Sequence, residues 1–262
     1  MSDAMIINQL NKSWKSTCKV LLGQEVGELS EFTNYLKTYT DPIVKRKSIL
    51  SGNDVTISSN RVPKQAPVIG HEEMHEYEKR MFSMPFNIND IKDVDSIIHA
   101  AKEKVCYAGN IVLGHSTNVI NSHRCVNTVY AMGCQDVYDG KYVAYTTSIR
   151  SPEYSFGCCF GGEIQFCIKV LDPHKQLRCL ETYHCNVASD SFYSASLEDC
   201  TNCIFSFNQR NKNYLIGNIQ LTKDKYAELK SKLVGEFADE LKRKKKLPSI
   251  IEIISGKGDW NG

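Results

Sequence analysis

The sequence predicts a mainly β protein with flanking α-helices, in which a parallel β-helix (solenoid) core is capped by N-terminal helices and a C-terminal amphipathic helix. From Cys106 to about Asn218, helical periodicity is absent, and short β-branched and aromatic pieces alternate with Ser, Asn, Gly and Cys. Two segments of this region, Cys125–Met132 and Cys200–Phe207, share the pattern Cys-x-Asn-x-aliphatic-aromatic-x-apolar. Amphipathic segments with helical spacing precede and follow the region. These three observations predict a repeat fold with helical ends.

The two similar segments predict the size of the repeat. They are offset by 75 residues, which corresponds to three coils of roughly 25 residues each. Equivalent positions in successive coils of a β-helix stack about 4.8 Å apart. Small residues such as Cys, Ser, Val and Ala then fill a narrow interior, and Asn suits the corners because it tolerates the left-handed conformation. The alternative is an irregular antiparallel sandwich in which the two segments match by accident.

The region before the solenoid, residues 1–105, is predicted to be helical with one hairpin. Apolar residues at spacings of three and four, among them Leu10 and Trp14, predict a helix over 3–22 with Asp3 as its N-cap. The other elements predicted here are a short helix over 28–38, a strand-turn-strand unit with strands 48–50 and 55–57, and a helix over 90–105.

The solenoid is predicted to span residues 106–221 and to be followed by a capping helix with a basic end, residues 222–247, and a tail, residues 248–262. Thr222 can cap this helix, and its apolar stripe consists of Tyr226, Leu229, Leu233 and Phe237. Because an exposed end strand invites edge pairing, we expect the helices on either side of the repeats to cover the open ends of the solenoid.

Composition narrows the class of protein. The 262 residues carry 32 basic and 30 acidic side chains, so no large field of one sign points to a nucleic-acid or membrane partner. No apolar run approaches the roughly 20 residues that span a bilayer, and the first thirty residues lack a secretory hydrophobic region. With 11 cysteines, at least one thiol is unpaired. We therefore expect a cytoplasmic protein, or one assembled into a particle made in the cytoplasm, that is not secreted by a signal peptide.

Part of the chain resembles a family. The segments Ser189–Ser194, Leu197–Asn208 and Lys212–Asn218, with the helix to Leu241, look like the end of Cys-rich β-solenoid repeat proteins encoded by tailed phages, archaea and candidate-phylum bacteria. The resemblance covers about Cys106–Leu241 and implies a β-solenoid with a C-terminal helix. It carries no established activity, so it assigns no catalytic residue. In phage genomes a rigid solenoid is most often part of the virion, which is an analogy of fold alone.

One motif indicates zinc chemistry. His71, Glu72 and His75 fit the pattern His-Glu-x-x-His, in which two imidazoles one helical turn apart bind zinc and the glutamate activates water. The surrounding Glu73, Glu76 and neighbouring charges are instead typical of the start of a solvated surface helix. A zinc-dependent hydrolase using these three residues is therefore an alternative function, next to a plain surface helix.

A second group could hold zinc structurally. Cys179, Cys185, Cys200 and Cys203, with His184 nearby, provide two pairs of thiols that resemble a zinc ribbon. The same cysteines could simply be stacked reduced thiols that fill the solenoid interior. The sequence leaves zinc as a possible cofactor and implies no other.

Many β-helices cleave polysaccharides, so a polysaccharide-active enzyme is a further alternative. The available carboxylate pairs are Asp136 with Asp139 and Glu198 with Asp199. A stripe of tyrosines could stack on sugar or a partner, or could serve packing alone. Its members are Tyr130, Tyr138, Tyr142, Tyr145 and Tyr154.

The last predicted helix ends in five consecutive cations, Lys242, Arg243, Lys244, Lys245 and Lys246. They complement the negative end of the helix dipole, or they contact an anionic surface such as nucleic acid or an acidic protein. Taken together, the sequence favours a structural or interaction protein rather than an enzyme. We expect it to present a rigid solenoid face to protein partners or to further copies of itself, plausibly in a virion, with nucleic acid a secondary possibility and no membrane.

Overall fold

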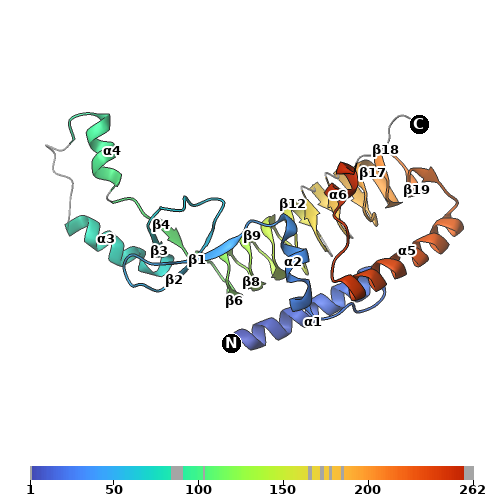
Figure 1. Cartoon of the computed structure of the whole chain (residues 1–262), viewed down its shortest axis with the longest axis horizontal. Helices are drawn as coiled ribbons and strands as arrows, with labels where there is room; N and C mark the ends of the chain where they lie inside the picture. The colour runs from blue at the N-terminus through green and yellow to red at the C-terminus, as the bar shows by residue number, and fades with distance from the viewer. Residues whose placement is uncertain are drawn as a thin grey trace.

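The computed structural model confirms the predicted solenoid with helices flanking it at both termini (Figure 1). The structure describes residues 2–83, 91–102, 104–164, 167–171, 174–176, 179–183 and 186–256. The strands of the repeat region are β4 (Tyr107–Gly109), β5 (Val112–Leu113), β6 (Thr117–Ile120), β7 (His123–Val126), β8 (Val129–Met132), β9 (Gln135–Tyr138), β10 (Lys141–Ala144), β11 (Thr147–Arg150), β12 (Cys159–Ile164), β13 (Val170–Leu171), β14 (His174–Gln176), β15 (Thr182–Tyr183), β16 (Asn186–Ser189), β17 (Ala195–Ile204), β18 (Phe207–Arg210), β19 (Asn213–Ile216) and β20 (Ile219–Gln220). No helix in the described part of the chain is long and apolar enough to cross a membrane.

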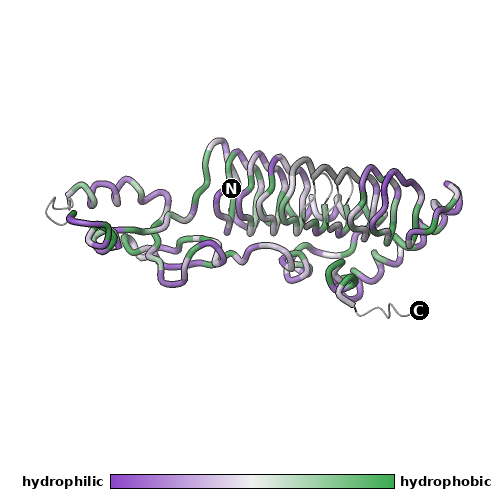
Figure 2. Tube along the Cα trace, turned by 90° about the horizontal axis from the view of Figure 1, so that it is seen from above, coloured by the Kyte–Doolittle hydropathy of each residue, from purple (hydrophilic) through white to green (hydrophobic). Residues whose placement is uncertain are grey.

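Each coil of the solenoid contains 12 residues. The sequence-based expectation of a coil about twice as long is therefore wrong. In the parallel sheet, Gln135 pairs with Thr147 and Thr147 pairs with Cys159, each one coil further along. The coils stand in one row (Figure 2). The offset between Cys125 and Cys200 is not a whole number of such coils, so the two similar segments lie on different sides of the solenoid.

The coil is built from four similar segments of three residues. In the regular part, every third residue has a positive φ, for example Arg124 (56°), Asn127 (50°) and Tyr130 (57°). These left-handed residues bend the chain four times per coil. Because the offset between the two similar segments is a multiple of three, the sequence comparison detected this three-residue pattern and not the coil.

The residue after each left-handed position points into the interior. Cys125, Thr128, Ala131, Cys134 and Val137 follow one another at this spacing and are completely buried. Small side chains predominate in this narrow interior, as predicted, and larger aliphatic groups occur at a few equivalent positions, namely Ile149, Leu197 and Leu215.

Interior hydroxyls and thiols bond to the backbone in a repeated way. The Cys134 thiol donates to the carbonyls of Met132 (3.4 Å) and Val143 (3.7 Å), while the Cys134 N–H donates to the Ser122 hydroxyl of the previous coil (3.0 Å). The Thr146 hydroxyl makes the equivalent bonds to the carbonyls two residues before and nine residues after it. At these positions a thiol and a hydroxyl therefore make the same pair of bonds to backbone carbonyls, so Cys134 and Thr146 satisfy their polar groups in the same way.

A second apolar column lies on the outside of the solenoid. It has one member in each coil and belongs to a hydrophobic cluster distinct from the interior. Its members are Ile120, Met132, Ala144, Phe156, Ile168, Leu180, Phe192, Ile204 and Ile216. The helices α1 (Asp3–Leu22), η1 (Leu29–Phe32), α2 (Thr33–Leu36), η2 (Lys37–Tyr39) and α5 (Lys223–Lys244) are the elements beside this column (Figure 1). We call this side the covered face.

The helix α5 starts at the last coil and runs back along the covered face. The rings of Tyr226 and Tyr214 have centroids 5.5 Å apart, and Phe237 lies 5.2 Å from Tyr193 and 5.8 Å from Phe205. Within the predicted apolar stripe, Tyr226 and Phe237 are buried, whereas Leu229 and Leu233 are half-buried. The helix thus flanks the solenoid along its side, and the last coil ends in β20, which pairs antiparallel with β19.

The helices of the N-terminal region lie in two places: α1 and α2 lie beside the covered face, and α3 and α4 lie beyond the first coil (Figure 1). The predicted first helix is confirmed as α1, although its N-cap is Ser2 and not Asp3. The predicted hairpin exists as β1 (Ile43–Lys47) and β2 (Asp54–Ser58), but residues 48–50 belong to the turn instead of the first strand. The remaining elements are β3 (Val68–Gly70), η3 (His71–Glu73), α3 (Met74–Ser83) and α4 (Val94–Lys102), and the predicted tail contains α6 (Ile250–Ser255).

Candidate functional site

The residues of the His-Glu-x-x-His motif lie near the start of the solenoid. His71 and Glu72 belong to the 3-10 turn η3, whereas His75 is in α3 and is exposed. Glu72 accepts a hydrogen bond from the Asn110 side chain (3.2 Å), and Glu73 accepts one from the Ser48 hydroxyl (2.6 Å). Within the described residues, no group of three His, Cys, Asp or Glu side chains is placed to hold a metal ion. The motif thus forms the start of a surface helix here.

The cysteines of the candidate zinc ribbon are spread over several coils. Cys179, Cys200 and Cys203 are buried. Cys185 and the neighbouring His184 lie outside the described residues. Cys179 and Cys203 are two coils apart in one interior column, which separates them by roughly 10 Å at about 4.8 Å per coil. Two sulfurs on one zinc lie at most about 4.6 Å apart, since each bond is about 2.3 Å. The described members of this group are distributed along the solenoid interior, and they do not converge on one metal.

Three of the four candidate carboxylates, Asp136, Asp139 and Glu198, are held by cations or by an amide. Asp136 forms ion pairs with Arg61 and with Arg124 (2.9 Å). Further along the solenoid, Glu198 pairs with Arg210 (2.8 Å). Neither arrangement leaves two facing carboxylates around an open space, which glycoside hydrolysis requires.

The predicted tyrosine stripe is partly a packing ladder. Tyr130, Tyr142 and Tyr154 are one coil apart and stack with ring centroids 5.1 and 5.2 Å apart. They are half-buried and pack against the cluster under the helices. Tyr145 is buried and bonds to the Thr33 hydroxyl (3.0 Å), so these rings support the covered face and are not a sugar platform.

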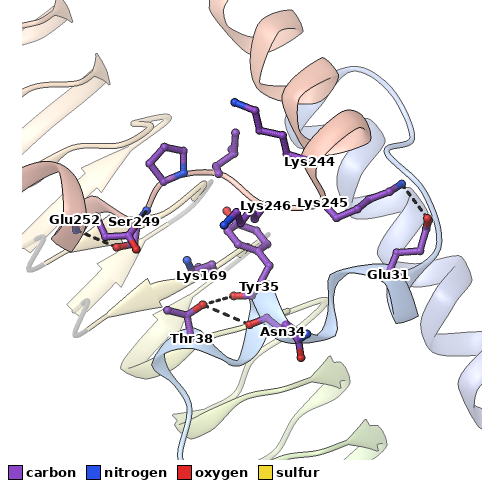
Figure 3. Close-up of a pocket in the computed structure, with 12 residues that line it drawn as sticks. Glu31, Asn34, Tyr35, Thr38, Lys169, Lys244, Lys245, Lys246, Ser249 and Glu252 are labelled. Carbon is purple, nitrogen blue, oxygen red and sulfur yellow. Dashed lines mark hydrogen bonds and ion pairs between the residues drawn. The ribbon is translucent and has the colours of Figure 1, made fainter.

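Among the predicted sites, the basic cluster Lys242–Lys246 is the one that lies at a pocket. Lys244, Lys245 and Lys246 line a pocket of about 510 Å³ between α2 and the segment that joins α5 to α6 (Figure 3). Lys245 pairs with Glu31 (2.9 Å), and Lys244 pairs with Glu240 (2.7 Å). The other two cations lie nearby: Lys242 donates to the Gln24 side chain, and Arg243 pairs with Glu240 (2.6 Å). In the described part of the chain, Lys246 is the pocket lysine without an ion pair.

A buried ion pair lies beside this pocket and was missed by sequence reasoning. The Lys169 ammonium lies 3.2 Å from the Glu181 carboxylate, and the two side chains are 1% and 0% exposed. Lys169 also lines the pocket, and its ammonium lies 4.2 Å above the Tyr35 ring and 4.6 Å above the Tyr39 ring. Burial lowers the pKa of Lys169, and the attraction of Glu181 opposes this shift.

Glu181 joins three elements through its hydrogen bonds. It accepts from the hydroxyls of Tyr39 (2.6 Å), Tyr193 (3.3 Å) and Tyr35 (3.4 Å), and from the N–H of Ile250 at the start of α6 (2.8 Å). Burial and the negative charge of Glu181 raise the pKa of Tyr39. The carboxylate therefore fastens η2 and α6 to the solenoid and fixes one wall of the pocket. The sequence does contain a signal for this ion pair, because Lys169 and Glu181 carry opposite charges, lie 12 residues apart and each follow an apolar residue. That signal can be recognised only when the length of the coil is known.

No protein-family model, curated protein or solved structure matches this chain. Function is therefore inferred from the arrangement of the described residues.

Proposed function

We propose that the protein is a structural or interaction protein whose solenoid presents a rigid face to partner subunits. One observation carries the proposal, which is the difference between opposite sides of the solenoid. The covered face is apolar and is occupied by the helices of the chain itself. Half a coil away, the outward residues are mostly polar or charged. We call this second side the open face; its exposed or half-exposed polar members in the described part of the chain are Asn127, Tyr138, Asp139, Arg150, Ser151, Glu198, Asp199, Arg210 and Asn211.

The open face has the properties of a docking surface. Side chains one coil apart bond along it, as Asn127 does to Asp139 (3.1 Å) and Arg210 to Glu198 (2.8 Å). The parallel ladders beneath hold the backbone in a regular array, so little conformational entropy is lost when a partner binds. Alternating acidic and basic groups favour a partner with complementary charges and discourage a purely apolar one. The resemblance to phage solenoid proteins makes a particle subunit the partner that we favour.

Site-specific photo-crosslinking tests this proposal. A photoreactive amino acid is placed at Arg150 on the open face or, as a matched control, at Lys232, an exposed cation of α5 on the opposite side. We expect one discrete cross-linked partner band from position 150 in the native host and none from position 232. Equal cross-linking from both positions, or none from position 150, would contradict a partner on the open face.

A second candidate function is anion binding at the basic pocket, favoured by the lysines that line it. It would provide contact with nucleic acid or with an acidic segment of a partner. Lys246→Ala should weaken the binding of a short single-stranded oligonucleotide and reduce its salt dependence, whereas Lys232→Ala should change neither. Binding that is absent, or equal in both variants, would remove this candidate.

A further inference from the structure

The helices α3 and α4 form an arm that extends away from the first coil (Figures 1 and 2). Neither helix contains a buried residue, although α4 carries large apolar side chains. Val94 is 71% exposed and Ile98 is 47% exposed, and the flanking Ile91 and Val105 are 45% and 63% exposed. A helix as short as α4 is marginal in isolation, and an exposed apolar stripe adds to the cost of leaving it alone.

The apolar residues of α4 follow the spacing of a coiled coil. Val94, Ile98 and Ala101 lie within the helix and are separated by four and three residues, whereas Ile91 precedes the helix and Val105 follows it. The three helical residues occupy successive d, a and d positions, whose side chains form a single seam on one side of the helix. Ile98 lies near the middle of this seam, with Val94 four positions before it and Ala101 three positions after it. Such a seam also fits a second, identical helix that runs in the opposite direction.

The charges beside the seam select that direction. Asp95 and Lys102 both occupy e positions, next to the d residues Val94 and Ala101. In an antiparallel pair the e positions of the two helices face each other, so Asp95 meets Lys102 of the second copy, and the same contact forms twice. In a parallel pair e positions face g positions, where Ile97 would stand opposite Lys102 of the second copy without an ion pair.

We propose that the protein dimerises through antiparallel pairing of α4 with α4 of a second copy, with Ile98 next to the two-fold axis. The contact is isologous, so the same patch serves both copies and the assembly closes as a dimer. The arm extends beyond the first coil at one end of the row of coils (Figures 1 and 2), so the pairing leaves the later coils of both open faces free for the partners proposed above. The dimer and the partner contact can consequently fail independently.

Light scattering coupled to size-exclusion chromatography tests the proposal on the full chain. We expect the wild-type protein at twice the chain mass of 29.6 kDa. Ile98→Asp should halve the observed mass, whereas His99→Asp, an exposed neighbour outside the seam, should leave it unchanged. Far-UV circular dichroism and the melting temperature should be the same in both variants, because α4 contains no buried residue.

The charged pair provides a test that does not depend on burying a charge. Asp95→Lys places like charges opposite each other in the antiparallel pair and should give monomers. Combining Asp95→Lys with Lys102→Asp restores opposite charges and should recover the dimer. A monomeric wild-type protein, a dimer that survives Ile98→Asp, or a double variant that stays monomeric would each overturn the proposal.

Discussion

The ammonium of Lys169 and the carboxylate of Glu181 form an ion pair at 3.2 Å beneath the helices that cover the solenoid. The two residues are one coil apart, and each has a positive φ, 53° and 48°. Glu181 is additionally satisfied by three tyrosine hydroxyls and one backbone N–H, whereas the ammonium has the carboxylate and two aromatic faces. Lys169 therefore depends on Glu181 for its stabilisation more than Glu181 depends on Lys169.

We predict that Glu181→Leu destabilises the protein more than Lys169→Met. Removing Glu181 leaves an uncompensated ammonium beneath the covering helices and takes away the acceptor shared by four donors, which costs about 3–5 kcal/mol. Removing Lys169 leaves a carboxylate that still accepts hydrogen bonds from Tyr39 and Ile250, so the loss is smaller. Urea denaturation of both variants measures the difference. Equal losses, or a greater loss in Lys169→Met, would show that the hydrogen bonds do not stabilise the carboxylate.

His123 should make the stability of the protein depend on pH. The ring is completely buried and contacts the Tyr107 hydroxyl (3.2 Å). Burial lowers the pKa of His123 to about 4. The negative charge of Asp136 opposes this shift, whereas the positive charges of Arg124 and Arg61 add to it. Between pH 6.5 and pH 4 the unfolded chain binds a proton that the folded chain does not bind. The stability therefore falls as the pH falls through this window, by roughly 3 kcal/mol in total.

Denaturant unfolding at several pH values between 7 and 4 checks this prediction. His123→Gln should lose that part of the pH dependence while keeping the contributions of the carboxylates. If the free energy of unfolding depends on pH equally in the wild-type protein and in His123→Gln, then His123 binds its proton as readily in the folded state as in the unfolded state, which would contradict the prediction.

The interior thiols should tolerate a hydroxyl but not a larger side chain. Cys134→Ser keeps a donor for the carbonyls of Met132 and Val143, so it should cost less than about 1 kcal/mol. Cys134→Leu removes that donor and overfills the interior, at a cost of about 1–3 kcal/mol. The control is Cys106→Leu, where the thiol is half-exposed, which should change the free energy of unfolding little. A Cys134→Leu variant as stable as the wild type would contradict a narrow, filled interior.

The left-handed positions should reject β-branched residues. Asn208 is exposed and has a φ of 54°, so Asn208→Val is expected to cost about 1–2 kcal/mol and Asn208→Gly almost nothing. Asn213 is equally exposed but lies in β19, where valine is favoured, so Asn213→Val should be tolerated. The melting temperatures of the three variants test this prediction. Equal decreases for Asn208→Val and Asn213→Val would contradict a left-handed conformation at Asn208.

The solenoid was predictable because its local rule is visible in the sequence. A small residue such as Cys125 or Cys200 follows a position that tolerates left-handed geometry, and this recurs every three residues. The length of the coil was misjudged because the coil consists of four similar segments of three residues. Two stretches of the sequence therefore resemble each other at any offset that is a multiple of three, whether or not they lie a whole number of coils apart. The apolar column with one member per coil, for example Phe156, Ile168 and Leu180, contained the missing information.

The pocket was only partly predictable for a physical reason. The basic cluster at Lys242–Lys246 was identified from its charge alone. The partners of Lys169 and Glu181 come from η2 and α6, far away in the sequence, and only packing brings them together. The helix α6 did have a local signal, because Ser249 and Glu252 form a capping box with N–H···O distances of 3.0 and 2.8 Å.

The length of the coil, on which both faces depend, can be tested by deletion. Removing Lys141–Pro152 deletes one full coil and keeps every later residue on its own side of the solenoid. Removing only residues 141–151 shifts every later residue by one position, which turns Ser155 and Cys158 out of the interior. Far-UV circular dichroism during thermal melting should show a folded, cooperatively melting protein for the full-coil deletion and an unfolded or aggregated one for the deletion that is one residue shorter. Identical behaviour of the two deletions would contradict a solenoid with 12 residues per coil.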